Sequence, residues 1–203
     1  MHRSKKGILV AIEGIDGSGK TTVAKKLVER LRNLGYNAEY TYEPYVSYFS
    51  EAFKKYIEEY GVAEPEIETL AMALDRAFHV RKVIAPLLMK GYIVVTDRYL
   101  YSSYAYQGAR GVDIEWIKIV NKYAIEPDVS IYLRVPLEIA IARKRAVEPR
   151  WSYFEDIDRL VKVQEIYEQL VKDGLLLVVD ATQTVERVVE DCLEIVLARV
   201  NHE

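Results

Sequence analysis

The chain has 203 residues, enough for one sizeable α/β domain with a hydrophobic core and few for two. Half of the residues are hydrophobic, 29% are charged and the formal net charge is −3. This balance is typical of a globular protein and argues against a basic nucleic-acid binder. We also expect no membrane partner, because no apolar run approaches the roughly 18 residues of a membrane span and the N-terminus lacks the features of a signal peptide. The single cysteine, Cys192, excludes an internal disulfide and favours a cytoplasmic location.

Five short apolar runs have the composition of buried strands. In chain order they are residues 7–14, 37–44, 92–98, 129–135 and 175–181. Two sets of apolar residues at helical spacing lie between them. Val23, Leu27, Val28 and Leu31 mark a helix that stops before Gly35, and Leu70, Leu74, Ala77, Ile84 and Leu88 mark one that ends at Gly91. Strands that alternate with helices predict a single α/β domain over residues 1–203, with a five-stranded parallel sheet flanked by helices.

The first strand runs directly into a glycine-rich phosphate-binding motif. Gly14, four further residues and then Gly19-Lys20-Thr21 satisfy the P-loop pattern, between a strand and a helix as the mechanism requires. Glycines allow several backbone N–H groups to face one anion, Lys20 would reach the β- and γ-phosphates, and the Thr21 hydroxyl would bind Mg²⁺. A plain glycine-rich turn is the alternative. The motif predicts a P-loop NTPase fold, with these nucleotide-binding residues: Gly14, Ile15, Asp16, Gly17, Ser18, Gly19, Lys20, Thr21 and Thr22.

Later residues narrow the class of P-loop protein. The nearest match to a guanine-reading motif, Asn121 to Ala124, has alanine where a carboxylate is needed, which excludes a GTPase switch. Asp97 ends the third predicted strand, the usual place for the carboxylate that holds Mg²⁺ water in this fold. Arg98 follows at once, and its planar guanidinium suits a phosphate monoester, although a surface salt bridge is the alternative. The sequence from Arg98 onward therefore predicts a pocket with tyrosine walls.

Several segments together resemble the thymidylate kinases, which phosphorylate dTMP with ATP. They are AIEGIDGSGKTT (11–22), Glu43-Pro44, DRAFHV (75–80), TDRYLYSSYAYQG (96–108) and DATQTVERV (180–188). The resemblance covers the whole chain in the right order. It implies a P-loop kinase with Mg²⁺ as cofactor, ATP and dTMP as substrates, and a homodimer.

The resemblance also implies roles for individual residues. Arg98 would hold the dTMP phosphate, Tyr106 would lie under the deoxyribose, and Asp16 would help to place the sugar hydroxyl and the metal. Around the base, Ser103 would meet the polar edge of thymine, Gln107 would close the base side, and Arg76 would donate to a thymine carbonyl. The remaining residues that it implies are Glu43 on the acceptor side, and Ala181 and Gln183, which would border the adenine.

Three departures from the family pattern stand out. Met72 occupies the position, four residues before Arg76, where the family stacks an aromatic ring on thymine; a thioether can still pack on a ring. The loop after the second strand reads TYEPYV, without the arginine and two glycines that the family often has there. Lys54 stands where the family often has a phosphate-binding arginine, which would replace a fork of donors with a point charge.

The catalytic arginine of this family lies either in the phosphate loop or in a mobile lid. The phosphate loop here has no arginine. A helix that begins near Pro136 leads into a segment with Arg143, Arg145 and Arg150, which we expect to form a lid over about residues 143–156 that neutralises transition-state charge. Arg145 and Arg150 are the leading pair, and a solvated charge run is the alternative. With Lys20, Asp16 and Arg98, these arginines complete the predicted catalytic set.

Two other functions stay open at this point. A kinase of the same fold could act on another nucleotide or nucleoside, although Arg98 favours a monophosphate acceptor. A non-catalytic nucleotide-binding protein could keep the fold, although Lys20, Thr21, Asp97 and the arginines of the lid speak against it.

Overall fold

The computed structural model describes residues 7–147 and 157–201. Its elements follow one another as β1 (Ile8–Glu13), α1 (Lys20–Asn33), β2 (Ala38–Tyr42), α2 (Tyr48–Tyr60), α3 (Pro65–His79), the π-helical turn η1 (Val80–Ile84), α4 (Ala85–Met89), β3 (Ile93–Asp97), α5 (Leu100–Gly108), α6 (Ile114–Val120), β4 (Val129–Arg134), α7 (Leu137–Val147), α8 (Ile157–Lys172), β5 (Leu177–Asp180) and α9 (Val185–Asn201). The order of strands and helices is the one that the apolar pattern predicts.

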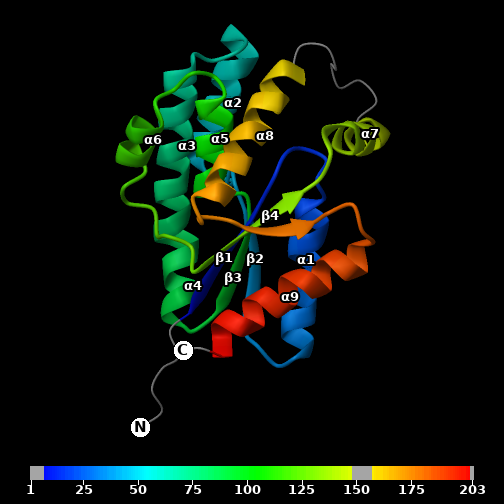
Figure 1. The fold of residues 1–203 in the computed structure, drawn as a ribbon. Coiled ribbons are helices and arrows are strands. Elements are labelled where there is room, and N and C mark those ends of the chain that lie inside the picture. The colour runs from blue at the N-terminus through cyan, green and yellow to red at the C-terminus, as the bar shows by residue number, and fades with distance from the viewer. Residues whose placement is uncertain (1–6, 148–156, 202–203) are drawn as a thin grey trace.

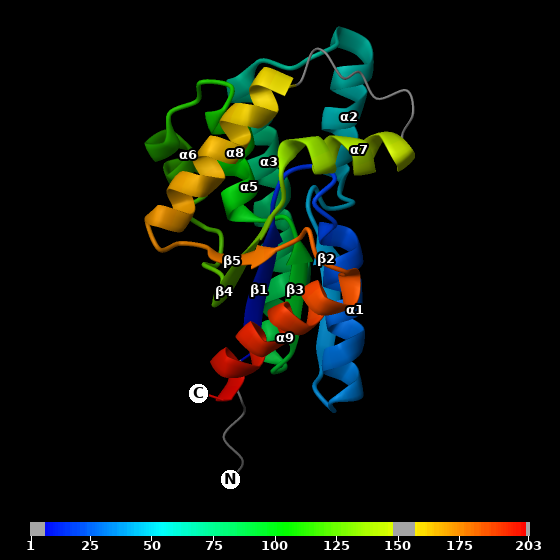
Figure 2. The same cartoon turned by 45° about the vertical axis from the view of Figure 1, so that its right-hand side comes forward.

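The five strands form one parallel sheet in the order β2-β3-β1-β4-β5. All six residues of the central strand β1 and all five of β3 are buried. Strands covered on both faces in this way read as continuous apolar runs, which is why the sequence revealed them. Figures 1 and 2 show α1 and α9 together on one side of the sheet, with α3, α5, α6 and α8 on the other. The predicted five-stranded parallel sheet flanked by helices is confirmed.

The first predicted helix is α1, whose four marker residues, Val23, Leu27, Val28 and Leu31, are all buried. The second is present but is interrupted by η1. Its markers Leu70 and Leu74 are 50% and 49% exposed, whereas its markers Ile84 and Leu88 meet the core, together with Ala73 and Val80. Polar residues of α3 share the inward face, so the apolar spacing located the helix but did not show which side of α3 is buried.

The parallel register gathers the chemistry at one edge of the sheet. Asp97 lies opposite Ile12 of β1 on one side and Tyr42 of β2 on the other. Two hydrogen bonds continue this alignment past the strands: the Glu43 N–H donates to Asp97 O at 3.0 Å, and the Arg98 N–H donates to Ile12 O at 2.9 Å. As a result, the phosphate loop, Asp97 and Glu43 lie together at the carboxyl ends of neighbouring strands, where α/β sheets bind ligands.

Arg98 has a φ of 67°, a left-handed conformation that non-glycine residues rarely adopt. Such backbone strain often accompanies functional positions.

Among the described residues, no helix combines the length and the apolar character that crossing a bilayer requires.

Candidate functional site

Two cavities meet at the carboxyl edge of the sheet. The larger, of about 560 Å³, lies over the phosphate loop and the start of α1. The smaller, of about 250 Å³, lies between α3 and α5. Three residues line both: Asp16, Glu43 and Arg98. Two ligands placed in these cavities would therefore share a boundary formed by two carboxylates and one guanidinium.

The phosphate loop has the geometry that its glycines predict. Gly17 and Gly19 have φ angles of 83° and 94°, and a Cβ atom on Gly17 would lie 2.1 Å from the Ala140 carbonyl oxygen of α7. All seven predicted residues from Asp16 to Thr22 line the larger cavity, whereas Gly14 and Ile15 are the buried start of the loop. The loop can therefore present its backbone N–H groups to the cavity.

Lys20 is 6% exposed, and its Nζ donates to Ile15 O at 2.8 Å. Burial, together with the nearby charge of Arg98, lowers the pKa of Lys20 to about 7. A polyanion would supply the negative charge that this ammonium lacks. The lysine is thus held at the cavity with its charge poorly compensated, as a phosphate-binding group requires.

Thr21 and Asp97 form a corner of the larger cavity. The Thr21 hydroxyl donates to Asp97 Oδ2, while Asp97 Oδ1 and the Ser18 hydroxyl are buried with no hydrogen-bond partner among the described residues. Oxygen donors of this kind, few in number and next to a phosphate site, are the ligands that Mg²⁺ takes beside a nucleotide. The predicted metal residues therefore lie together, and they fit the ion.

Arg98 occupies the boundary between the cavities. Its guanidinium donates to Ser102 Oγ at 3.2 Å, to Tyr106 Oη at 3.1 Å, to Gly14 O at 3.4 Å and to Asp16 Oδ1. It also lies 4.6 Å from the centroid of the Tyr106 ring. Burial alone would raise the pKa of Asp16, but the charges of Arg98 and Lys20 lower it overall. A phosphate that binds Arg98 must compete with Asp16 for it.

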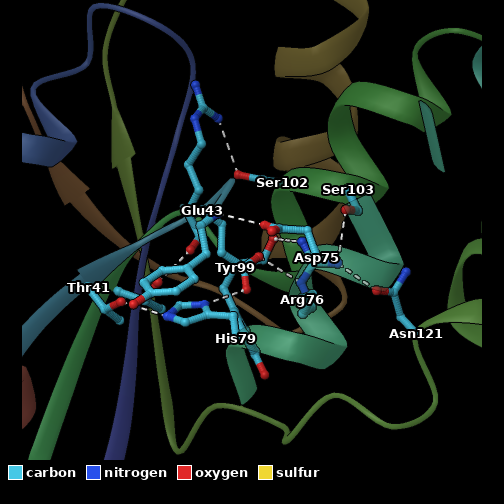
Figure 3. Close-up of polar contacts among 12 residues, drawn as sticks. Thr41, Glu43, Asp75, Arg76, His79, Tyr99, Ser102, Ser103 and Asn121 are labelled. Carbon is cyan, nitrogen blue, oxygen red and sulfur yellow. Dashed lines mark hydrogen bonds and ion pairs between the residues drawn. The ribbon is translucent and has the colours of Figure 1, made fainter. Parts of the chain in front are cut away.

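Arg76, the predicted reader of the base, is held on several sides, as Figure 3 shows. Nε donates to Glu43 Oε2 at 2.8 Å, Nη1 to Ser103 Oγ and Asn121 Oδ1 at 3.0 and 2.6 Å, and Nη2 to Tyr99 O at 3.0 Å. Of the five N–H donors of a guanidinium, one on Nη2 makes no hydrogen bond within the described residues and could serve a ligand. Asn121, which begins the rejected guanine motif, is thus a buried partner of Arg76.

The TYEPYV loop is built on α3 in place of the missing arginine and glycines. Asp75 accepts from the Tyr45 N–H at 2.6 Å and from Ser47 Oγ at 2.5 Å, and Ser47 caps α2. The Tyr45 ring stacks on His79, with centroids 4.5 Å apart. His79 in turn contacts Glu43 Oε1 at 3.1 Å and Thr41 Oγ1 at 2.6 Å (Figure 3). These contacts hold Glu43 at the boundary of both cavities.

The structure brings most of the predicted acceptor residues together. The smaller cavity is lined by Glu43, Met72, Arg76, Arg98, Ser103, Tyr106 and Gln107. Lys54 is not among them. It lies on α2 with 77% of its side chain exposed, 3.9 Å from Glu58. A phosphate-binding role for Lys54 therefore stays a prediction from the family resemblance, at a position that lines neither cavity.

Two predicted donor-side residues and the first of the predicted lid arginines lie at the larger cavity. Ala181, Gln183 and Arg143 line it, and Arg143 Nη1 donates to Ala181 O at 3.0 Å. Arg145 lies exposed near the end of α7. Arg150 and most of the predicted lid lie outside the described residues.

Some residues of the site were missed in the sequence. Glu68 lines the smaller cavity, and Tyr42 and Lys144 line the larger one. Glu68 precedes Met72 by four residues, so it shares a helix face with Met72 and Arg76. That spacing was the available signal for Glu68. Tyr42 and Lys144 had no comparable signal.

A phosphate loop that opens through an arginine into a second, smaller cavity defines a class of protein, the P-loop kinases, in which one site holds the phosphate donor and the other the acceptor. The profile of the thymidylate kinase family matches residues 12–192. A probable thymidylate kinase of Staphylothermus marinus is 44% identical over 94% of this chain and 95% of its own. Probable thymidylate kinases of Saccharolobus solfataricus and Pyrococcus abyssi are 42% and 38% identical, over 93% and 98% of this chain and 96% and 98% of their own.

The chain therefore belongs to the thymidylate kinase family, and thymidylate kinase is the activity that this membership assigns to it.

Proposed function

We propose that the chain transfers the γ-phosphoryl group of ATP to the 5′-phosphate of dTMP, with ATP in the larger cavity and dTMP in the smaller one. The observation that carries this assignment is the position of Arg98, which lines both cavities beside Asp16. A phosphate oxygen of dTMP attacks the γ-phosphorus directly, the bond from that phosphorus to the β,γ-bridging oxygen breaks, and ADP and dTDP result. The chain forms no covalent bond in this reaction.

The donor residues follow from the larger cavity. The buried ammonium of Lys20 would bind the β- and γ-phosphates, and the backbone of the phosphate loop would surround them. Thr21 and Asp97 would hold Mg²⁺, which supplies charge neutralisation to the phosphates when bound. Ala181 and Gln183 would border the adenine, where Val185 and Val188 add apolar surface.

The acceptor residues follow from the smaller cavity. Arg98 would exchange Asp16 for the dTMP phosphate, and Tyr106, held by its hydrogen bond with Arg98, would support the sugar. Arg76 can offer one remaining N–H to the base, and Ser103, Gln107 and Met72 would surround it. A bare nucleoside would leave Arg98 without a phosphate, so a monophosphate acceptor is favoured.

We also propose that residues 1–203 form a single domain and that residues 143–156 form a lid. Arg143, Arg145 and Arg150 would be the arginines of this lid.

A coupled assay of ADP release tests the proposed function. With ATP, Mg²⁺ and dTMP, the wild-type chain should release ADP at a rate that depends on dTMP. Lys20→Met should abolish this release, because the phosphates lose their cation, and circular dichroism should show an unchanged fold. Release that does not depend on dTMP, or near-normal turnover in a folded Lys20→Met variant, would contradict the assignment.

We also propose that the chain is a homodimer that pairs through α2 and α3. None of the thirteen residues of α2, all of them described, is buried, although the helix includes Tyr48, Phe49 and Tyr60. On α3, Ile67, Leu70 and Leu74 are 40–50% exposed. An apolar surface of this kind is typical of subunit interfaces.

A cytoplasmic location stays a prediction from the single cysteine, Cys192. This cysteine is buried, and burial raises the pKa of its thiol to about 12.

Light scattering tests the dimer. The wild type should have twice the chain mass, and Leu74→Glu should shift it toward the monomer. Leu34→Glu, at an equally exposed leucine (53%) at the end of α1, is the control and should stay dimeric. A monomeric wild type, or equal effects of the two variants, would refute the α2–α3 interface.

A further inference from the structure

Gln107 has one end of its amide bound and the other end free. The residue is 4% exposed and lies on α5 at the smaller cavity. Its Nε2 donates to Glu68 Oε1 at 2.7 Å. Its Oε1 is buried with no hydrogen-bond partner among the described residues. A buried acceptor without a donor destabilises the folded protein, so its presence indicates a ligand that donates to it.

Chemistry fixes which end of the amide is free. A carboxylate only accepts hydrogen bonds, so Glu68 must face the NH₂ group of Gln107 and not its oxygen. Glu68 is itself held by Arg110, whose Nη1 donates to Glu68 Oε2 and whose Nη2 donates to Ala63 O at 2.6 Å. Turning the amide over would place two acceptor oxygens against each other. Glu68 and Arg110 therefore allow one orientation of Gln107.

We propose that Glu68 and Arg110 are positioning residues that set the hydrogen-bond polarity of the acceptor site, by holding Gln107 Oε1 toward the base as an obligate acceptor. A base with an N3–H donor, thymine or uracil, satisfies this oxygen. Cytosine presents an unprotonated N3, a second acceptor, and is rejected. The assignment rests on the proposed function, because it places a pyrimidine in the smaller cavity.

The neighbouring residues provide the opposite polarity. Ser103 Oγ accepts from Arg76, which leaves the hydroxyl hydrogen free to donate, and Arg76 keeps one N–H of its own. One fixed acceptor beside donors is the complement of an imide edge, in which N–H stands between two carbonyls. Met72, which also lines the cavity, contributes no polarity. Selection between thymine and cytosine therefore depends on the orientation of Gln107.

Glu68→Gln is the test, because an amide at position 68 can accept or donate and so releases Gln107 to turn over. We expect the ratio of kcat/KM for dTMP to that for dCMP to fall roughly tenfold, as for the loss of one hydrogen bond. The change should lie in KM for dTMP, with kcat within about twofold. Glu66→Gln, at an exposed glutamate of the same helix, is the matched control and should leave the ratio unchanged.

A second background separates positioning from a general structural effect. In Gln107→Leu the acceptor is gone, so adding Glu68→Gln should change the ratio no further. Dissociation constants of dTMP and dCMP by calorimetry report the same ratio if turnover is slow, and Arg110→Met should shift it in the same direction if Glu68→Gln does not fold. A ratio unmoved in Glu68→Gln, or an effect that persists in Gln107→Leu, would overturn the positioning role alone. A wild type that does not phosphorylate dTMP would overturn the proposed function and this role with it.

Discussion

Replacing Arg98 with alanine separates the two cavities functionally. The guanidinium makes a salt bridge with Asp16, whose side chain is 41% exposed, and hydrogen bonds with Ser102 and Tyr106. A charge-assisted contact to the dTMP phosphate contributes about 1.5–3 kcal/mol. Giving up the partly exposed pair with Asp16 offsets about 0.5 kcal/mol of this. Arg98→Ala should therefore weaken dTMP binding by about 1–2.5 kcal/mol, roughly 5- to 70-fold.

The assay is calorimetric titration of each substrate separately. The dissociation constant of dTMP should rise by that factor in Arg98→Ala, and that of ATP should change by less than about threefold, since Lys20 and the loop backbone remain. Arg134→Ala is the control, because the Arg134 side chain pairs with Glu168 and lines neither cavity. Loss of ATP affinity with unchanged dTMP affinity would show that Arg98 belongs to the donor site and would reverse the assignment of the two cavities.

Three further predictions concern other residues of the two cavities and their surroundings. Burial lowers the pKa of Lys20 to about 7 in the free protein, and the bound phosphates should restore its ammonium form. ATP binding should therefore take up about one proton near pH 8.5 and almost none near pH 6. Calorimetry in buffers of different ionisation enthalpy measures this uptake, and release of a proton would contradict the prediction. Met72→Phe should raise the preference for dTMP over dUMP. The thymine methyl contributes about 1–3 kcal/mol in a tight pocket, and a flexible thioether provides only the low end of that range. If the wild-type ratio of kcat/KM for dTMP to that for dUMP is already far above about 100 and the substitution does not change it, position 72 does not set base choice. Asn121→Leu should lower the free energy of unfolding by about 1–3 kcal/mol, because Arg76 loses a buried acceptor. Urea unfolding measures this change. An unchanged midpoint would mean that Ser103 and Tyr99 O alone satisfy the Arg76 donors.

The sequence predicts the fold well because the features that specify it are local. Buried parallel strands are continuous apolar runs, and the P-loop spacing places Lys20 and Thr21 at the start of α1 without any long-range information. The exposed face of α3 was not predictable in this way. Leu70 and Leu74 have the same spacing as core leucines, and only the polar network around Arg76 shows why the other face turns inward.

The site was predictable where a residue acts through its own motif, and less so where it acts through contacts between distant elements. Asp97 ends β3 and Arg98 follows it, and both were recognisable from that position. The partnership of Arg76 with Asn121 joins residues 45 positions apart, and that of Gln107 with Glu68 joins residues 39 apart. Lys54 shows the converse, since a position inferred from family resemblance alone lies on an exposed helix and lines neither cavity.

The central claim is that the acceptor is dTMP. The most direct measurement is a competition in which equal concentrations of dTMP, dUMP, dCMP, dAMP, dGMP and UMP share one reaction with ATP and Mg²⁺, and the diphosphates are identified by mass spectrometry at early times. We predict that dTDP forms first, with dUDP the next product and little UDP, because Tyr106 lines the smaller cavity, where we propose that it supports the sugar. If another diphosphate formed before dTDP, or if no diphosphate formed, the result would contradict the account.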